Sequence, residues 1–502
     1  MNRYKIKILA GALSFSVAYL ACNDKALDIA PPTQSEGTYF TSEAEFRSAI
    51  LGVYAALTDF YSASSATGFG SAQQQVWMLP GDDMTINGGD SYEIFKGLSE
   101  GNGKLNEFFK SAYFLNGRAN KVLEKLAVAP DDLFKTPGMK KFNEGEALFL
   151  RGFSHFMLFN VFGTAPVDTI VPKSTAEFNL PSSKGTELLD QAIKDFTRAA
   201  ALLPPSWNDI NKGRVTANSA NGMLGKALVF RGNISKNAAD YQAAIAAFDR
   251  ITGASLTTNF NDNFSVTTEN NSESLFEFQG GKNLIGQGQN AWLGNDVCDC
   301  GVAGSYYQMF YDGAGTYMGG GRYLPTEKLS NAFEAADPRI LFTLNEGKTH
   351  IVKYVVNGDA LDGAVLSLNN TRVLRLADVL LLKAEAVLQS GGSTAQAIEL
   401  INQVRARARG NGTLPADLNT GETNKTTIQQ WIMDERLREL AGEGHRWFDL
   451  RRWHMAGFIT LNNAFFSSQV ADRMEFMPHH LYFPIPSAET SRNPNIVQNP
   501  GY

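Results

Sequence analysis

Apolar residues recur every three to four positions over most of this chain, a spacing that puts them on one face of a helix. The pattern predicts helices at residues 42–60, 105–128, 140–162, 184–203, 216–235, 240–252, 372–389, 393–409 and 426–453. Ser42 followed by Glu45 is a capping box that starts the first of them. Strand-like runs are short, and the clearest are 274–278 and 350–356. The chain is therefore predicted to be mainly α.

Several of the predicted helices share one texture of small and large residues. The segment EALFLRG at 146–152 recurs as KALVFRG at 226–232, with a looser echo, LLLKAEA, at 380–386. Small residues among large apolar ones let a partner helix approach closely. This texture is typical of helix-turn-helix repeats of the tetratricopeptide kind, about 34 residues each. We expect repeats separated by long insertions, and an ordinary helical bundle is the alternative.

Two long segments between the helices have a different composition. Residues 61–104 are rich in Gly, Ser and Asn, and residues 253–370 are rich in Gly, Asn, Tyr and Thr, with short strand-like runs. Long loops in a compact protein usually carry function, while the elements beside them act as scaffold. We therefore divide the body, 37–502, into a helical part 37–252, a loop-rich insertion 253–370 and a C-terminal part 371–502.

The N-terminus has the pattern of a secretory signal. Arg3, Lys5 and Lys7 precede an apolar run that ends at Cys22 and is too short to span a bilayer. A cysteine at this point predicts a lipoprotein signal, residues 1–21, and a lipid on Cys22. Residues 22–36 would be the tether. The alternative is an ordinary secreted protein cut near Ala21, with Cys22 as a spare thiol.

Net charge and cysteine content limit the classes of partner, metal and cofactor that we expect. The formal net charge is −6, which disfavours nucleic acid. Cys298 and Cys300 form either a strained disulfide across one residue or two free thiols, and a zinc site would need two more ligands at suitable spacing. We predict no metal and no cofactor other than the lipid on Cys22.

The loop segments hold the residue types that bind carbohydrate. Sugar rings present a C–H face that packs on Trp or Tyr, and hydroxyls that pair with Asn, Asp, Gln and Arg. The candidate ligand-binding residues are Trp77, Asp82, Asp83, Asn87, Trp292, Asn295, Tyr306, Tyr307 and Tyr311. For each one, packing within the fold is the simpler interpretation. Asp82 and Asp83 are equally compatible with a hard cation or a solvated turn.

No segment has the order of residues that marks a known catalytic motif, although a carboxylate pair assembled in space is not visible in sequence. The segment 435–453 alternates Glu and Arg around Trp447 and Trp453. We interpret it as structural, with charges that pair at three- and four-residue spacing along one helix and tryptophans that stack on guanidinium groups.

The same segment identifies a family. ERLRELAGEGHRWFDLRRW at 435–453 closely resembles the SusD/RagB family of outer-membrane lipoproteins. Further matching segments are ALFLRGF at 147–153, FGTAP at 162–166, DPR at 337–339, RLADVLLLKAEA at 375–386, INQVRARA at 401–408, LYFPIP at 481–486, NPN at 493–495 and QNPGY at 498–502.

The resemblance implies a helical fold of about four tetratricopeptide-like pairs that support a loop-rich half. It implies a lipid-anchored protein on the exterior of a Bacteroidetes-type outer membrane. Such a protein captures oligosaccharides for a TonB-dependent transporter of the SusC kind and is not an enzyme. We carry over no ligand residues. A surface glycan hydrolase, a protein-binding adaptor and a peptide-binding member of the same family remain as alternatives.

Overall fold

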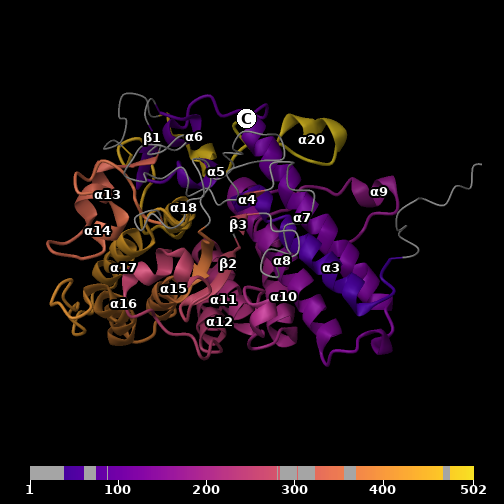
Figure 1. Ribbon diagram of the computed structural model, residues 1–502. Helices are drawn as coiled ribbons and strands as arrows, with labels where there is room; N and C mark the ends of the chain where they lie inside the picture. Colours follow the sequence, from indigo (N-terminus) through magenta and orange to yellow (C-terminus); the bar gives the residue numbers. More distant parts are fainter. Residues whose placement is uncertain are drawn as a thin grey trace, which may run out of the picture.

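Successive long helices pack against one another along most of the chain (Figure 1). The computed structural model describes residues 39–61, 75–86, 89–279, 281–282, 302–303, 323–354, 369–466 and 475–502. The N-terminal helices are α3 (Glu43–Ala55), α4 (Thr58–Tyr61), α5 (Gln75–Met78), α6 (Ser91–Ile94), α7 (Gly103–Val128), α8 (Met139–Phe162), α9 (Thr175–Phe178), α10 (Glu187–Leu202), α11 (Ala217–Ser235) and α12 (Ala238–Phe248). Helix α8 packs against α7 and α10, and α11 packs against α10 and α12.

The C-terminal helices continue this arrangement. They are α13 (Glu327–Ala332), α14 (Ile340–Thr343), α15 (Leu376–Gln389), α16 (Thr394–Arg409), α17 (Lys425–Leu440), α18 (Arg446–Ala456) and α20 (Ser487–Arg492). Helix α12 packs against α15, which in turn packs against α16 and α17. The prediction of a mainly helical fold is confirmed, and α11–α12 and α15–α16 are the helix pairs that the sequence predicted.

Glycine allows two of these helix pairs to approach closely. A Cβ atom on Gly225 of α11 would lie 2.3 Å from Cε1 of Phe248 on α12. A Cβ on Gly152 of α8 would lie 3.1 Å from the Cβ of Asp195 on α10. Both distances are shorter than an ordinary contact. The repeated small residues therefore have the role that the sequence pattern indicated.

Short antiparallel strand pairs join segments that are far apart in sequence. β1 (Met84–Ile86) pairs with β5 (Tyr323–Pro325), β2 (Ser274–Phe278) with β6 (Thr371–Arg375), and β3 (Gly281–Lys282) with β4 (Val302–Ala303). The predicted strand 274–278 is confirmed. In the described part of 350–356, Ile351 makes only an isolated bridge with Leu344.

Several predicted helices have different bounds from those expected. The helix placed at 42–60 is two helices, α3 and α4, and the one placed at 240–252 is Ala238–Phe248. The helix placed at 372–389 begins at Leu376, because residues 371–375 pair with β2 instead. The helix placed at 426–453 is broken into α17 and α18. Gly442 and Gly444 between them have φ values of +74° and +80°, which glycine adopts without strain. Helical periodicity did not reveal this turn, because the apolar residues before and after it keep the spacing of a single continuous helix.

One hydrophobic core receives residues from all three parts of the predicted body. Phe149 of α8 meets Phe276 of β2 edge to face, with ring centroids 5.1 Å apart. Trp447 of α18 belongs to the same cluster. A second cluster lies among α15, α16 and α17. The three parts therefore share packing, while the boundaries drawn at 252 and 370 stay a prediction.

Candidate functional site

Trp77 lies in the core, so the simpler interpretation, packing within the fold, holds for this candidate, and its ring does not offer a free face to a sugar. The side chain is 3% exposed, and its ring meets Tyr61 and Phe108 edge to face at centroid distances of 6.3 and 5.8 Å. The indole also lies against the turn between α17 and α18, where a Cβ on Gly444 would approach Nε1 to 2.9 Å. Packing of this kind fixes helix α5 to the scaffold.

Asp82 is a buried partner of two cations. Arg446 donates from Nε to Oδ1 at 2.5 Å and from Nη2 to Oδ2 at 3.0 Å, and Lys328 also pairs with the carboxylate. Burial alone would raise the pKa of Asp82, but the charges of Arg446 and Lys328 hold it at about 2. The carboxylate therefore links the start of α18 to α13 and is not presented to solvent.

Asp83 is buried next to Asp82 and has a different electrostatic state. Burial and the negative charge of Asp82 raise the pKa of Asp83 to about 7. Its Oδ1 atom makes no hydrogen bond with any described residue. Within the described residues, no group of three or more His, Cys, Asp or Glu side chains could hold a metal ion. Neither a solvated turn nor a sugar-facing pair of carboxylates describes Asp82 and Asp83.

The other candidates lie outside the described residues. They are Asn87, Trp292, Asn295, Tyr306, Tyr307 and Tyr311, together with Cys22, Cys298 and Cys300. The described residues next to them come from distant parts of the chain and lie close together. Tyr61 stacks on Phe278 at 5.7 Å, and Ile86 pairs with Tyr323. Described residues of the first predicted loop segment therefore contact described residues of the second at these two points.

A small cavity of about 30 Å³ lies beneath these flanking residues and has room for one water molecule. Its lining includes Tyr61, Trp77, Lys226, Thr371 and His445. Lys226 Nζ lies 2.8 Å from Asp378 and 3.1 Å from Nδ1 of His445. Burial and the charge of Lys226 lower the pKa of His445 to about 4, so the imidazole is neutral at pH 7. A cavity of this size does not admit a sugar ring.

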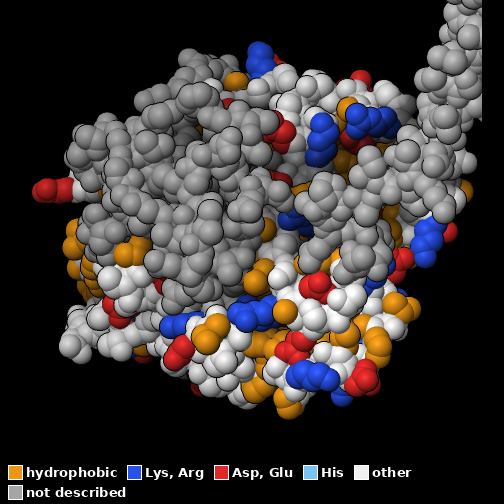
Figure 2. Space-filling view, turned by 45° about the vertical axis from the view of Figure 1, so that its right-hand side comes forward, with side chains coloured by type: hydrophobic (Ala, Val, Ile, Leu, Met, Phe, Trp, Pro, Cys, Tyr) orange, Lys and Arg blue, Asp and Glu red, His pale blue; other side chains and the backbone are white. Residues whose placement is uncertain are grey.

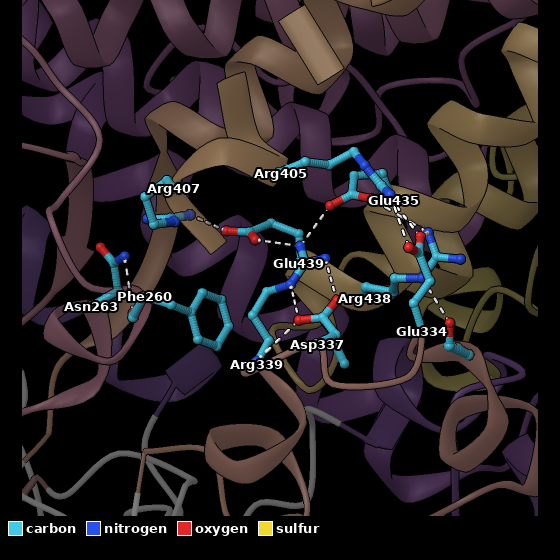
Figure 3. A network of polar contacts seen from close by, with 12 residues as sticks. Phe260, Asn263, Glu334, Asp337, Arg339, Arg405, Arg407, Glu435, Arg438 and Glu439 are labelled. Atoms are coloured by element: carbon cyan, nitrogen blue, oxygen red, sulfur yellow. Dashed lines mark hydrogen bonds and ion pairs between the residues drawn. The ribbon is translucent and has the colours of Figure 1, made fainter. Parts of the chain in front are cut away.

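The charged C-terminal motif forms a buried network rather than a binding site (Figure 3). Arg339 chelates Asp337 with distances of 3.0 and 2.7 Å and also donates to Glu435 and Glu439 at 2.6 and 3.0 Å. Glu439 lies between Arg339 and Arg407 (Figure 3). Burial would raise the pKa of Glu439, but Arg407, Arg375 and Arg339 hold it well below its usual range.

The interpretation of the motif as structural agrees with this burial, but the predicted mode of pairing is largely wrong. Arg438 with Glu435 and Arg452 with Asp449 do pair three residues apart. The other pairs join different elements, such as Arg436 with Asp378. Arg452 lies 4.9 Å from the Trp453 ring, as predicted, whereas Trp447 stacks on Phe483 at 6.3 Å.

Comparison with known proteins identifies the family. Residues 306–502 match the family model described as SusD family, and residues 27–229 match the model described as "Starch-binding associating with outer membrane". SusD-like protein P2 of Formosa agariphila is 25% identical over 545 residues and covers 100% of both chains.

Solved structures agree with this match. A SusD superfamily protein from Bacteroides vulgatus superposes with a TM-score of 0.73 at 25% identity, covering 93% of this chain and 100% of that one. A laminarin-binding SusD-like protein has the same fold, with a TM-score of 0.71 at 24% identity, covering 92% of this chain and 100% of that one. The two family models, the full-length relative and the shared fold together show that this chain belongs to the SusD/RagB family.

Proposed function

We propose that the protein binds oligosaccharides at the exterior of the outer membrane and passes them to a SusC-like TonB-dependent transporter. The observation that carries the proposal is the family match at both ends of the chain, one part of which is described as starch-binding and associated with the outer membrane. The laminarin-binding protein of the same fold supports a glycan as ligand. The protein acts as a binding protein and not as an enzyme.

Attachment to the membrane is assigned to the lipid on Cys22. Among the described residues, no helix combines the length and the apolar character needed to cross a bilayer. The tether 22–36 precedes the first described residue, 39, and includes Pro31 and Pro32, which stiffen it. The body would then stand off from the membrane surface.

Ligand contact is assigned to the remaining candidates, which lie outside the described residues. These are Asn87, Trp292, Asn295, Tyr306, Tyr307 and Tyr311. Trp77, Asp82 and Asp83 are instead buried within the scaffold. On the face shown in Figure 2, basic and acidic side chains are interspersed over the described surface. On this face the described surface therefore lacks the continuous basic stripe that is typical of nucleic-acid-binding proteins.

A glycan array with the protein comprising residues 23–502 tests the proposal. We expect binding to a restricted set of oligosaccharides, with no shortening of those oligosaccharides after long incubation. A peptide array run in parallel distinguishes a peptide-binding member of the family. Binding to peptides alone, or release of shorter sugars from a bound glycan, would overturn the proposal. Absence of binding on both the glycan array and the peptide array would favour an adaptor that binds protein.

A further inference from the structure

The link between α10 and α11 carries a tryptophan that the sequence pattern did not single out. The link begins with Pro204 and Pro205 and includes the 3₁₀ turn Asp209–Asn211. Trp207 lies between them and is only partly buried. In the sequence, this tryptophan stands out only as an aromatic residue within a short polar link between two helices.

Three contacts fix the Trp207 ring. Its indole N–H donates to the carbonyl of Val215 at 2.8 Å. Phe142 of α8 meets the ring edge to face, with centroids 5.6 Å apart and an interplanar angle of 80°. The guanidinium of Arg214 lies 4.3 Å from the ring centroid. A partly exposed ring held in this way is already ordered before any ligand arrives, which lowers the entropic cost of binding.

Trp207 lines two hollows on the surface, and Ser206 and Arg214 line both of them as well. The larger has a volume of about 330 Å³ and is also lined by Arg47 and Phe142. The smaller has a volume of about 240 Å³ and is also lined by Lys212. The larger volume falls within the range of small-molecule sites, which begins at about 300 Å³.

Some of the charged side chains that line the two hollows are already paired with other residues. Arg214 is neutralised by Glu146, to which its Nε donates at 2.6 Å. The carboxylate of Glu43 in the larger hollow accepts from the backbone N–H of Thr136 at 2.8 Å, and Glu277 in the smaller accepts from Asn270 and Asn370 at 3.0 and 2.8 Å.

By contrast, one cationic side chain that lines each hollow is free to pair with a ligand. Arg47 and Lys212 are exposed, and neither side chain forms a hydrogen bond or ion pair with a described residue. Each hollow therefore offers one unengaged cation beside an ordered aromatic wall, while its carboxylate is already satisfied. Guanidinium and ammonium groups of this kind recognise carboxylate or sulfate groups.

We propose that Trp207, Arg47 and Lys212 form a second saccharide site, distinct from the candidate loop residues, that takes an acidic saccharide bearing carboxylate or sulfate groups. The sugar ring packs its C–H groups against the indole, and the acidic groups on neighbouring units pair with the cations on either side. The site deepens the proposed function and rests on it, because it names a class of glycan. An acidic peptide is the alternative occupant that the test must separate.

Isothermal titration with a tetragalacturonate and a neutral laminari-oligosaccharide of equal length tests the site. The variant Arg47→Glu/Lys212→Glu reverses both cations. The matched control, Lys110→Glu/Lys194→Glu, makes the same change of net charge at two exposed lysines outside both hollows. We expect the first variant to weaken tetragalacturonate binding at least tenfold at low salt and the control to leave it unchanged. Neither variant should alter the affinity for the neutral sugar.

Tryptophan fluorescence adds an independent readout. Tetragalacturonate should change the emission of the wild type, and Trp207→Phe should abolish that change while its melting temperature shows that it is folded. The proposal is overturned if the two charge-reversal variants behave alike, or if a glutamate tetrapeptide competes as well as the uronate. If the wild type binds array glycans but the two charge-reversal variants do not differ, only the second site is refuted. If the wild type binds no glycan at all, the proposed function is refuted as well.

Discussion

Arg375 and Glu439 form a buried ion pair that joins the strand β6 to the C-terminal motif. Nη1 of Arg375 donates to Oε1 of Glu439 at 2.6 Å, and Nη2 donates to the backbone carbonyl of the same residue at 2.8 Å. Arg375 also donates to Glu273 and Glu443 at 2.8 Å each. The pair therefore joins β6 to α17, and Arg375 also ties in the residue that precedes β2 and the turn that follows α17.

Removing the acidic partner should destabilise the fold. Glu439→Gln leaves three buried guanidinium groups short of a counter-ion, and we expect a loss of about 3–5 kcal/mol in the free energy of unfolding. Glu399→Gln, on the exposed face of α16, is the control and should change stability by less than about 0.5 kcal/mol. Urea denaturation followed by circular dichroism measures both. Equal stability of the two variants would show that the network adds little.

Much of this fold could be predicted because helices reveal themselves locally. Apolar spacing located α7, α8, α10 and α11 within a few residues, and Ser42 with Glu45 marked the start of α3 as the capping box that the structure contains. The break at Gly442 and Gly444 was missed, because left-handed backbone leaves no mark in an apolar pattern. The partners of Arg339 and Arg375 were missed because they lie on other elements, and pairing across space has no period in sequence.

Asp83 predicts a pH dependence of stability. Burial, with the charge of Asp82, raises its pKa from 3.8 to about 7 in the folded protein. A raised pKa means that the folded state binds the proton more tightly than the unfolded state does. This contribution to stability is fully present below about pH 4 and is lost as the pH rises through about 7, to a total of no more than about 4 kcal/mol.

Asp83→Asn should remove this dependence. We expect the variant to gain stability relative to the wild type between pH 4 and pH 8, with the largest difference at pH 8. Thermal melting across that range is the measurement, and Asp132→Asn, at an exposed position, serves as the control. Parallel pH profiles for wild type and Asp83→Asn would show that Asp83 ionises normally.

The close contact between α11 and α12 gives a test of the helix-pair scaffold. Gly225→Ala places a methyl group 2.3 Å from the Phe248 ring and should cost about 1–3 kcal/mol through overpacking. Gly117→Ala in α7 has no atom within 4 Å of its new Cβ and should stabilise the helix by up to about 1 kcal/mol. Urea midpoints compare the two. The same sign for both substitutions would contradict the close-approach explanation.

The candidate site was less predictable than the fold. Trp77, Asp82 and Asp83 were chosen because they lie in a Gly-rich segment, but such a segment can still fold back into the core, as Trp77 does against Tyr61. Sequence composition cannot tell an aromatic ring that faces solvent from one that packs. Trp207 shows the converse, because its importance comes from the two hollows beside it, and these depend on α3, α8 and the segment near Asn270.

The proposed lipid anchor on Cys22 makes a prediction that does not depend on the ligand. Cys22→Ala should release the protein from the membrane fraction, because no thiol remains to take the lipid, and should leave the melting temperature unchanged. Fractionation in a strain that lacks the proposed SusC-like transporter excludes membrane attachment through that partner. Membrane association that persists there would count against the anchor.

Calorimetry with the best oligosaccharide from the array tests the central claim most directly. The wild type should bind with a Kd in the micromolar to millimolar range, about −8 to −4 kcal/mol. Trp292→Ala/Tyr306→Ala should lose at least tenfold in affinity, whereas Phe178→Ala, which removes a 72% exposed ring on α9, should bind like the wild type. Absence of binding to every oligosaccharide by the folded wild-type protein would contradict the account.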